Sequence, residues 1–341
     1  MSNKTVYVIG AGASSEVKLP TGAELKGKIA DLLNIQFDII KQQRGDRVIA
    51  EALKIITNDG DINPYLHEAW HICKALPLAI SIDNFIDAHK NNEKLEICGK
   101  LGIVQSILNA ERNSLLFIND SGLKISSLSD TWYLPFFRSI TENCTVEDLK
   151  SRFSSISLII FNYDRCAEHF LSNAIQIYFK ISEDQASEIL GSLCVYHPYG
   201  SVGALPWMKK GPSIPFGEKA KPQQLVELLK MIRTFTEGTS PESSNISEIR
   251  ESMSSANRIA FLGFAFHELN LQLLSSKQKY ENKSIVHYFA SSFGISDSDK
   301  DLIKRKIKSM YKISPRDHMV NSKCKDFFNE FWKGLAFSSD S

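Results

Sequence analysis

The sequence lacks any apolar run that approaches the roughly 20 residues needed to span a membrane. The apolar stretch after Lys4 is too short for a secretory signal, because it runs directly into a turn that contains glycine. Neither charge is in excess, since 40 basic and 39 acidic residues leave a net charge of +1. We therefore expect a cytoplasmic protein with no membrane contact and no direct nucleic-acid binding.

Closely spaced cysteines are also missing. The six cysteines form no Cys-x-x-Cys pair and lie at Cys73, Cys98, Cys144, Cys166, Cys194 and Cys324. A zinc ribbon requires two such pairs, so this kind of site is excluded, and free, largely buried thiols are expected. His67 and His71 have the outline of the zincin signature, but no third ligand follows at a zincin spacing. No metal is expected.

What the sequence does contain begins with a short apolar strand, Val6-Tyr7-Val8-Ile9, followed at once by a turn with two glycines. The turn consists of Gly10, Ala11, Gly12, Ala13, Ser14 and Ser15. A strand, a Gly-x-Gly turn and a following helix present backbone N–H groups to a pyrophosphate in α/β sheets. Because Ser15 stands where the dinucleotide motif has its third glycine, an ordinary tight turn is the alternative interpretation.

Four further apolar runs predict the other strands of a sheet. They cover 156–161, 193–197, 258–264 and 285–290, each ends at a small or polar residue, and helical patterns separate them. This alternation predicts the α/β class with a doubly wound, Rossmann-like parallel sheet. We expect an α/β domain over 1–35 and 150–300, a large helical insertion subdomain over 36–149, and a C-terminal helical tail over 300–341.

Polar side chains follow the predicted strands at their carboxyl ends, where ligands of open α/β sheets bind. Asn162 and Asp164 come directly after the second strand, although Asp164 can equally cap the helix that follows. The further candidates are His197, Tyr199 and Gly200 after the third strand, Gly263 in the fourth, and Ser291 after the fifth. A lone histidine at a strand end is often structural, but His197 shares its expected edge with the other polar groups.

The order of these motifs resembles the sirtuin-like fold. The resemblance lies in Gly10-Ala11-Gly12-Ala13-Ser14, Asn162-Tyr163-Asp164, His197-Pro198-Tyr199-Gly200-Ser201 and Phe261-Leu262-Gly263. Two further segments, Leu19-Pro20-Thr21-Gly22 and Ile82-Asp83-Asn84-Phe85, look especially like the bacterial sirtuin-like proteins of antiphage defence. The resemblance covers most of the chain, although it matches the helical insertion only in position.

The resemblance implies that the protein hydrolyses NAD to nicotinamide and ADP-ribose, as the defence members do, because the zinc ribbon of deacylating sirtuins is missing. It implies catalytic roles for Asn162, Asp164 and His197. Tyr199 is the alternative base, since the His-Gly of the family reads Tyr199-Gly200 here. It assigns the contacts to the rest of NAD to Gly10, Ala11, Gly12, Ser14, Ser15, Gly200, Gly263 and Ser291.

Regulation and competing functions also follow from this resemblance. A defence NADase must stay silent until it is triggered, so we expect a homo-oligomer or a separately encoded, helicase-like ATPase partner. The alternatives are an NAD-dependent deacylase or ADP-ribosyltransferase, and a non-catalytic nucleotide-binding sensor. A deacylase would consume NAD only with an acyl-lysine peptide, whereas a sensor would bind a nucleotide without consuming it.

Overall fold

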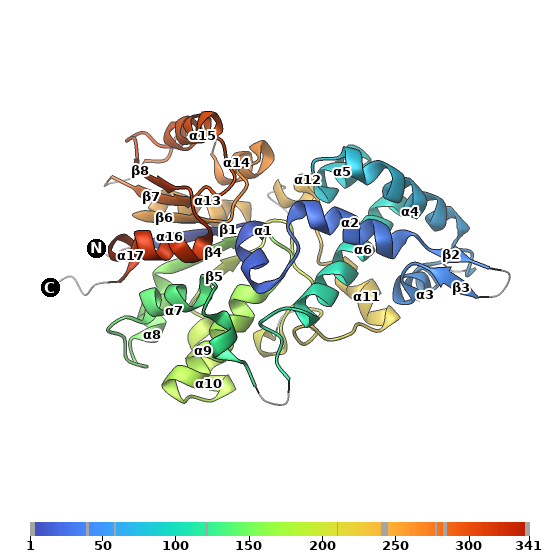
Figure 1. The fold of residues 1–341 in the computed structure, drawn as a ribbon, viewed down its shortest axis with the longest axis horizontal. Coiled ribbons are helices and arrows are strands. Elements are labelled where there is room, and N and C mark those ends of the chain that lie inside the picture. The colour runs from blue at the N-terminus through green and yellow to red at the C-terminus, as the bar shows by residue number, and fades with distance from the viewer. Residues whose placement is uncertain are drawn as a thin grey trace.

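A six-stranded parallel sheet forms the centre of the α/β fold, in the order β5-β4-β1-β6-β7-β8 (Figure 1). The computed structural model describes residues 4–38, 41–57, 59–119, 122–209, 211–239, 245–276, 278–281 and 285–337. The strands are β1 (Thr5–Ile9), β4 (Ile156–Ile160), β5 (Cys194–Tyr196), β6 (Arg258–Leu262), β7 (His287–Ser291) and β8 (Arg316–Val320). The chain leaves β1 for β4 and β5 and then crosses to β6, so the strand order reverses beside β1. The prediction of a doubly wound parallel sheet is confirmed.

The sixth strand, β8, lies where the sequence predicted only a helical tail. It pairs in parallel with β7, with Asp317 opposite Tyr288. Its sequence has no apolar run because it is an edge strand with polar side chains, and Asp317 forms ion pairs with Lys304 and Lys308 at 3.5 and 2.6 Å. The prediction of a wholly helical 300–341 was therefore wrong for this segment.

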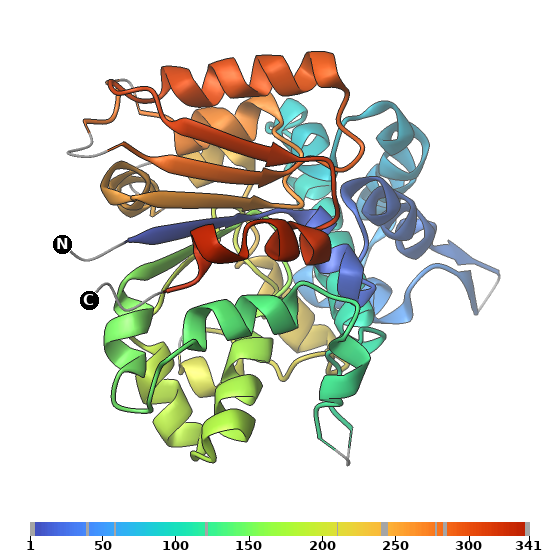
Figure 2. The same ribbon diagram turned by 60° about the vertical axis from the view of Figure 1, so that its left-hand side comes forward.

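Helices cover both faces of the sheet (Figure 2). Along β1, Val6 and Val8 belong to one hydrophobic core and Tyr7 and Ile9 to the other, because successive side chains of a strand point to opposite faces. The Tyr7 face packs on α7 (Tyr133–Thr141), α8 (Leu149–Ser154), α9 (Cys166–Phe179), α10 (Glu183–Leu190), α16 (Cys324–Glu330) and α17 (Trp332–Leu335). The Val6 face packs on α13 (Ile246–Ser255), α14 (Glu268–Leu274) and α15 (Asp297–Ser309).

A second group of helices lies beyond the carboxyl ends of the strands, on the right of Figure 1. It contains α2 (Gly22–Leu33), α3 (Arg47–Ile56), α4 (Asn63–Ala75), α5 (Ile82–Ala88), α6 (Glu93–Arg112), α11 (Pro222–Leu229) and α12 (Phe235–Thr239), with a hairpin of β2 (Gln36–Phe37) and β3 (Gln42–Arg44). Helix α2 packs on α4 and α6, α11 on α3 and α6, and α12 on α5. This helical subdomain therefore faces the sheet edge at which α/β proteins bind ligands.

The packing divides the chain differently from the boundaries that we expected. Helix α2 falls in the range expected for the α/β domain but packs in the helical subdomain, whereas α7, expected in the insertion, contacts α9 and α16. The aromatic face of α7 explains its position, since the rings of Tyr133 and Phe137 lie 5.0 and 6.1 Å from that of Phe170 on α9. The two units are thus joined by several chain crossings.

Candidate functional site

The glycine turn after β1 packs against a second turn, the one that follows β6. Gly10 donates its backbone N–H to Leu262 O at 2.9 Å, and Gly12 donates to Gly263 O at 3.0 Å. A Cβ on Gly10 would lie 2.5 Å from Gly263 O, and a Cβ on Gly263, where φ is +53°, would lie 2.0 Å from Ala13 N. The close approach of the two backbone turns to each other therefore requires glycine at these positions, whether or not a ligand binds there.

We expect Gly263→Ala to destabilise the protein by at least about 1–3 kcal/mol, the usual cost of a strained backbone at positive φ. The clash with Ala13 N pushes the two turns apart. Urea unfolding measures the loss, with Gly22→Ala as the control, because a Cβ on Gly22 meets no atom within 4 Å. Equal stability of the two variants would contradict this packing.

A cavity of about 520 Å³ opens where the strand order reverses, at the carboxyl ends of β1, β6, β7 and β8. Of the residues assigned to nucleotide contacts, the cavity is lined by Ala11, Gly12, Ser15, Gly263 and Ser291. Gly10, Ser14 and Gly200 are not among its lining residues. The rest of the wall consists of residues that had no predicted contact with a ligand, namely Glu16, Thr21, Gly22, Phe264, Ala265, Phe293, Gly294, Ile295, Ser322, Lys323 and Cys324.

Two of these residues give the cavity its polar character. Lys323 supplies a positive charge and lies with Nζ 5.7 Å from the centre of the Phe293 ring. The carboxylate of Glu16 accepts backbone N–H groups of Trp132 and Lys325 at 2.8 and 3.1 Å. Burial raises the pKa of Glu16, although these two N–H groups favour its charged form. No pattern in the sequence indicated Lys323 and Cys324, because they follow β8, a strand that was not predicted.

Asn162 and Asp164 lie on the other side of the glycine turn, at the carboxyl end of β4. Asn162 donates from Nδ2 to Ser14 Oγ at 2.9 Å. Asp164 Oδ1 accepts the backbone N–H of Cys166 at 3.1 Å, so it also stabilises the first turn of α9. Burial raises the pKa of Asp164, while hydrogen bonds from Cys166 and Ser14 oppose the rise. Ser14 thus joins the glycine turn to both polar side chains after β4.

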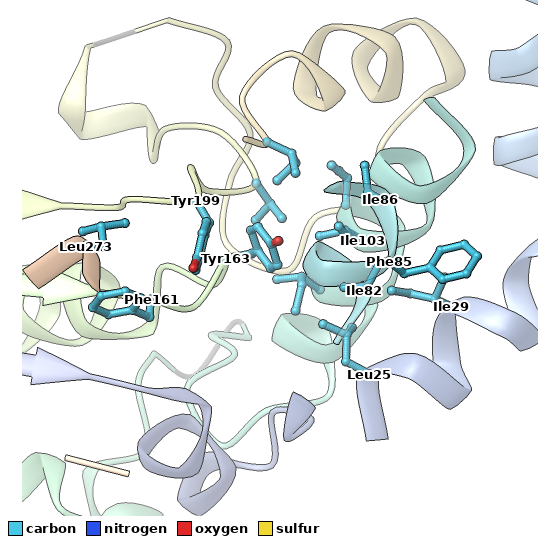
Figure 3. Close-up of a cluster of buried hydrophobic side chains, with 14 of the residues drawn as sticks. Leu25, Ile29, Ile82, Phe85, Ile86, Ile103, Phe161, Tyr163, Tyr199 and Leu273 are labelled. Atoms are coloured by element: carbon cyan, nitrogen blue, oxygen red, sulfur yellow. The ribbon is translucent and has the colours of Figure 1, made fainter. Parts of the chain in front are cut away.

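Tyr199, the alternative base, lies in the core between the sheet and the helical subdomain (Figure 3). Its hydroxyl donates to Asn270 Oδ1 at 2.6 Å, and its ring lies 5.9 Å from that of Phe161. Burial raises the pKa of Tyr199 far above its ordinary value, so the phenolate needed for a base is disfavoured. Gly200 has φ +75°, and a Cβ there would lie 1.8 Å from Met231 O, which gives this glycine a structural role.

His197, which follows β5, contacts the backbone of Asn162. Its Nδ1 is 3.1 Å from the carbonyl oxygen of Asn162, and its Nε2 is 2.7 Å from Oε1 of Glu168 on α9. Burial lowers the pKa of His197, but the Glu168 carboxylate, the Asn162 carbonyl and Asp164 together outweigh this effect, and the net shift is upward. Glu168 was not predicted, because an acid in the first turn of a helix is also what an exposed helix would carry.

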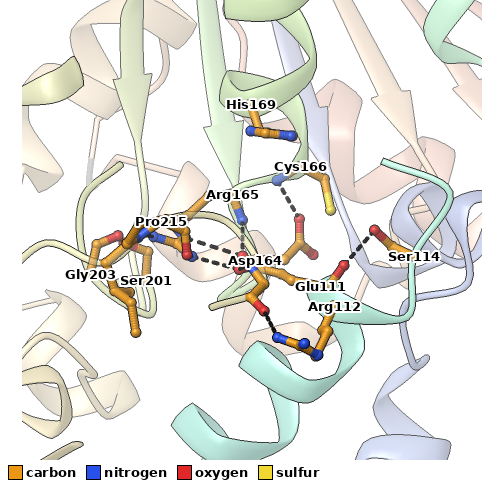
Figure 4. A network of polar contacts seen from close by, with 12 residues as sticks. Glu111, Arg112, Ser114, Asp164, Arg165, Cys166, His169, Ser201, Gly203 and Pro215 are labelled. Carbon is orange, nitrogen blue, oxygen red and sulfur yellow. Dashed lines mark hydrogen bonds and ion pairs between the residues drawn. The ribbon is translucent and has the colours of Figure 1, made fainter. Parts of the chain in front are cut away.

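A buried ion pair holds the long segment after β5 against this region (Figure 4). Arg165 and Glu111 are 1% and 0% exposed, and their side chains meet at 2.5 Å. Arg165 Nη1 also donates to the carbonyl oxygens of Ala204 and Ile214 at 3.2 and 2.6 Å, and Glu111 accepts the N–H of Gly217 at 3.1 Å. The pair therefore fixes both ends of the 204–217 segment.

Within the described part of the chain, no three His, Cys, Asp or Glu side chains gather so as to hold a metal ion. Every helix among the described residues is too short or too polar to cross a lipid bilayer. No protein-family model matches the chain, and no curated protein matches its sequence.

Proposed function

We propose that the protein is an NAD hydrolase that cleaves the bond between nicotinamide and ribose. One observation carries this proposal: the glycine turn has polar groups on both sides. On one side, Ser14 contacts the buried Asn162 and Asp164, and on the other, Ala11 and Gly12 line the cavity where the strand order reverses. A dinucleotide laid across this turn places one half in the cavity and the other beside Asn162. The motif resemblance to sirtuin-like NADases supports the same assignment.

The reaction needs positioning and stabilisation of charge more than strong nucleophilic chemistry. The bond from ribose C1′ to the nicotinamide nitrogen breaks, nicotinamide leaves neutral with the electron pair, and a cationic ribose centre develops. Water adds to C1′ and releases a proton to solvent. Asn162 orients the ribose or the water through its amide, and Asp164 orients the nicotinamide amide. Ala11, Gly12 and Lys323 hold the diphosphate half.

The deciding experiment incubates the purified full chain with NAD and separates the products by chromatography. We expect nicotinamide and ADP-ribose without any added peptide. Consumption of NAD only in the presence of an acyl-lysine peptide would instead identify a deacylase. Binding of NAD by calorimetry without consumption would favour the sensor, a function that the burial of Asn162 and Asp164 also permits. Self-assembly and a helicase-like partner remain predictions of the resemblance alone.

A further inference from the structure

Both ring nitrogens of His197 already face hydrogen-bond acceptors. Nδ1 lies 3.1 Å from a backbone carbonyl oxygen, that of Asn162, which can only accept. Nε2 lies 2.7 Å from Oε1 of Glu168. A proton therefore lies in each of these two contacts, and neither nitrogen offers a free lone pair to a substrate. This arrangement does not suit the general-base role that the sequence suggested for His197.

The surroundings of Glu168 indicate where the two protons reside. The Glu168 side chain is 3% exposed, and its second oxygen, Oε2, is buried without a hydrogen-bond partner among the described residues. A buried carboxylate needs a compensating positive charge, and His197 is the group in contact with it. The other acid that acts on His197 is Asp164, at the start of α9, and it also favours the imidazolium.

We propose that His197 and Glu168 form a buried ion pair that positions Asn162 through its backbone carbonyl, and that His197 is not the general base. The pair joins three elements, since Asn162 follows β4, His197 follows β5, and Glu168 belongs to α9. It sets the direction in which the Asn162 amide points, toward Ser14 and the substrate. This assignment of roles rests on the proposed function, whereas the ion pair itself can be tested without it.

The first test uses NMR of the histidine side chains and requires no turnover. In the wild-type protein, the ¹⁵N shifts of His197 should show both ring nitrogens protonated at pH 7, above the ordinary pKa of about 6.5. In Glu168→Gln the same imidazole should lose one proton at a lower pH. The signal is assigned with His197→Gln or, if that variant does not fold, as the resonance that moves in Glu168→Gln. A neutral His197 at pH 7 in the wild-type protein would overturn the proposal.

The second test compares NAD turnover by Glu168→Gln, His197→Gln and the double variant. We expect each single change to lower kcat by about 10- to 100-fold through misplacement of Asn162, with little change in KM. The double variant should be no slower than the worse single variant, because both changes break one unit. Any acidic limb of the pH–rate profile should persist in His197→Gln, whereas loss of that limb, with Glu168→Gln near wild type, would restore His197 as the base.

His67→Gln is the matched control, since it makes the same change at an exposed histidine on α4. It should leave both the His197 resonance and the turnover unaltered. If the wild-type protein does not hydrolyse NAD, the proposed function fails by itself. The NMR titration then still decides whether the ion pair exists, so the two failures are distinguishable.

Discussion

Asn162→Ala is expected to lower NAD turnover by about 10²–10³-fold, the range found when one preorganised polar group is removed from a catalytic site. Asn162 is 8% exposed, and its side-chain amide donates to Ser14 Oγ. Truncation to alanine therefore removes a polar group beside the glycine turn and no part of the apolar core. The loss of one hydrogen bond costs only about 1 kcal/mol in stability. Asn162→Ala should therefore lose most of its NAD turnover, while urea unfolding shows only a small loss of stability.

A second variant and a control make this prediction specific. Asn162→Asp keeps the shape but removes the Nδ2 donor and adds a negative charge near Asp164, so it should be as inactive as the alanine variant. Asn173→Ala removes an asparagine from α9 whose amide bonds the carbonyl oxygen of His169 at 2.8 Å, away from the proposed site. It should keep wild-type turnover. Wild-type turnover by Asn162→Ala would remove the catalytic assignment of this residue.

The fold was predictable where strands are buried on both faces. Apolar runs revealed five of the six strands, and four of these, β1, β4, β6 and β7, are buried along almost their whole length. The fifth, β5, is an edge strand that still carries the apolar residues Val195 and Tyr196. The edge strand β8 was not predicted because its sequence, Arg316 to Val320, has no apolar run, and Asp317 within it pairs with Lys304 and Lys308. The cavity wall formed by Lys323 and Cys324 was missed with it.

The charged part of the site was less predictable, for a different physical reason. In the sequence, Glu111, Arg165 and Glu168 look like ordinary residues of helix ends, where charged side chains are common. Glu111 and Arg165 are covered by the 204–217 segment, which folds back over them, and Glu168 contacts His197 from the chain after β5. Periodicity along the chain does not report such long-range packing. It also could not show that Ser14 faces Asn162 rather than the cavity.

Breaking the buried pair of Arg165 and Glu111 should have the largest effect on stability. Arg165→Met leaves the Glu111 carboxylate buried without its counter-ion, and removal of one partner of such a pair typically costs about 3–5 kcal/mol. It also leaves the carbonyl oxygens of Ala204 and Ile214 without their donor. The 204–217 segment should then exchange its amide hydrogens faster, which hydrogen–deuterium exchange measures alongside urea unfolding.

Two comparisons separate the buried charge from ion pairing in general. Lys150→Met breaks an ion pair of similar length, 2.6 Å to Glu188, but those side chains are 53% and 70% exposed, so no measurable change is expected. The double change Glu111→Leu with Arg165→Met removes both charges and should be less destabilising than Arg165→Met alone. If the double variant is instead the less stable, the carbonyl bonds of Arg165 matter more than charge balance, and the main function of this residue is to anchor the segment.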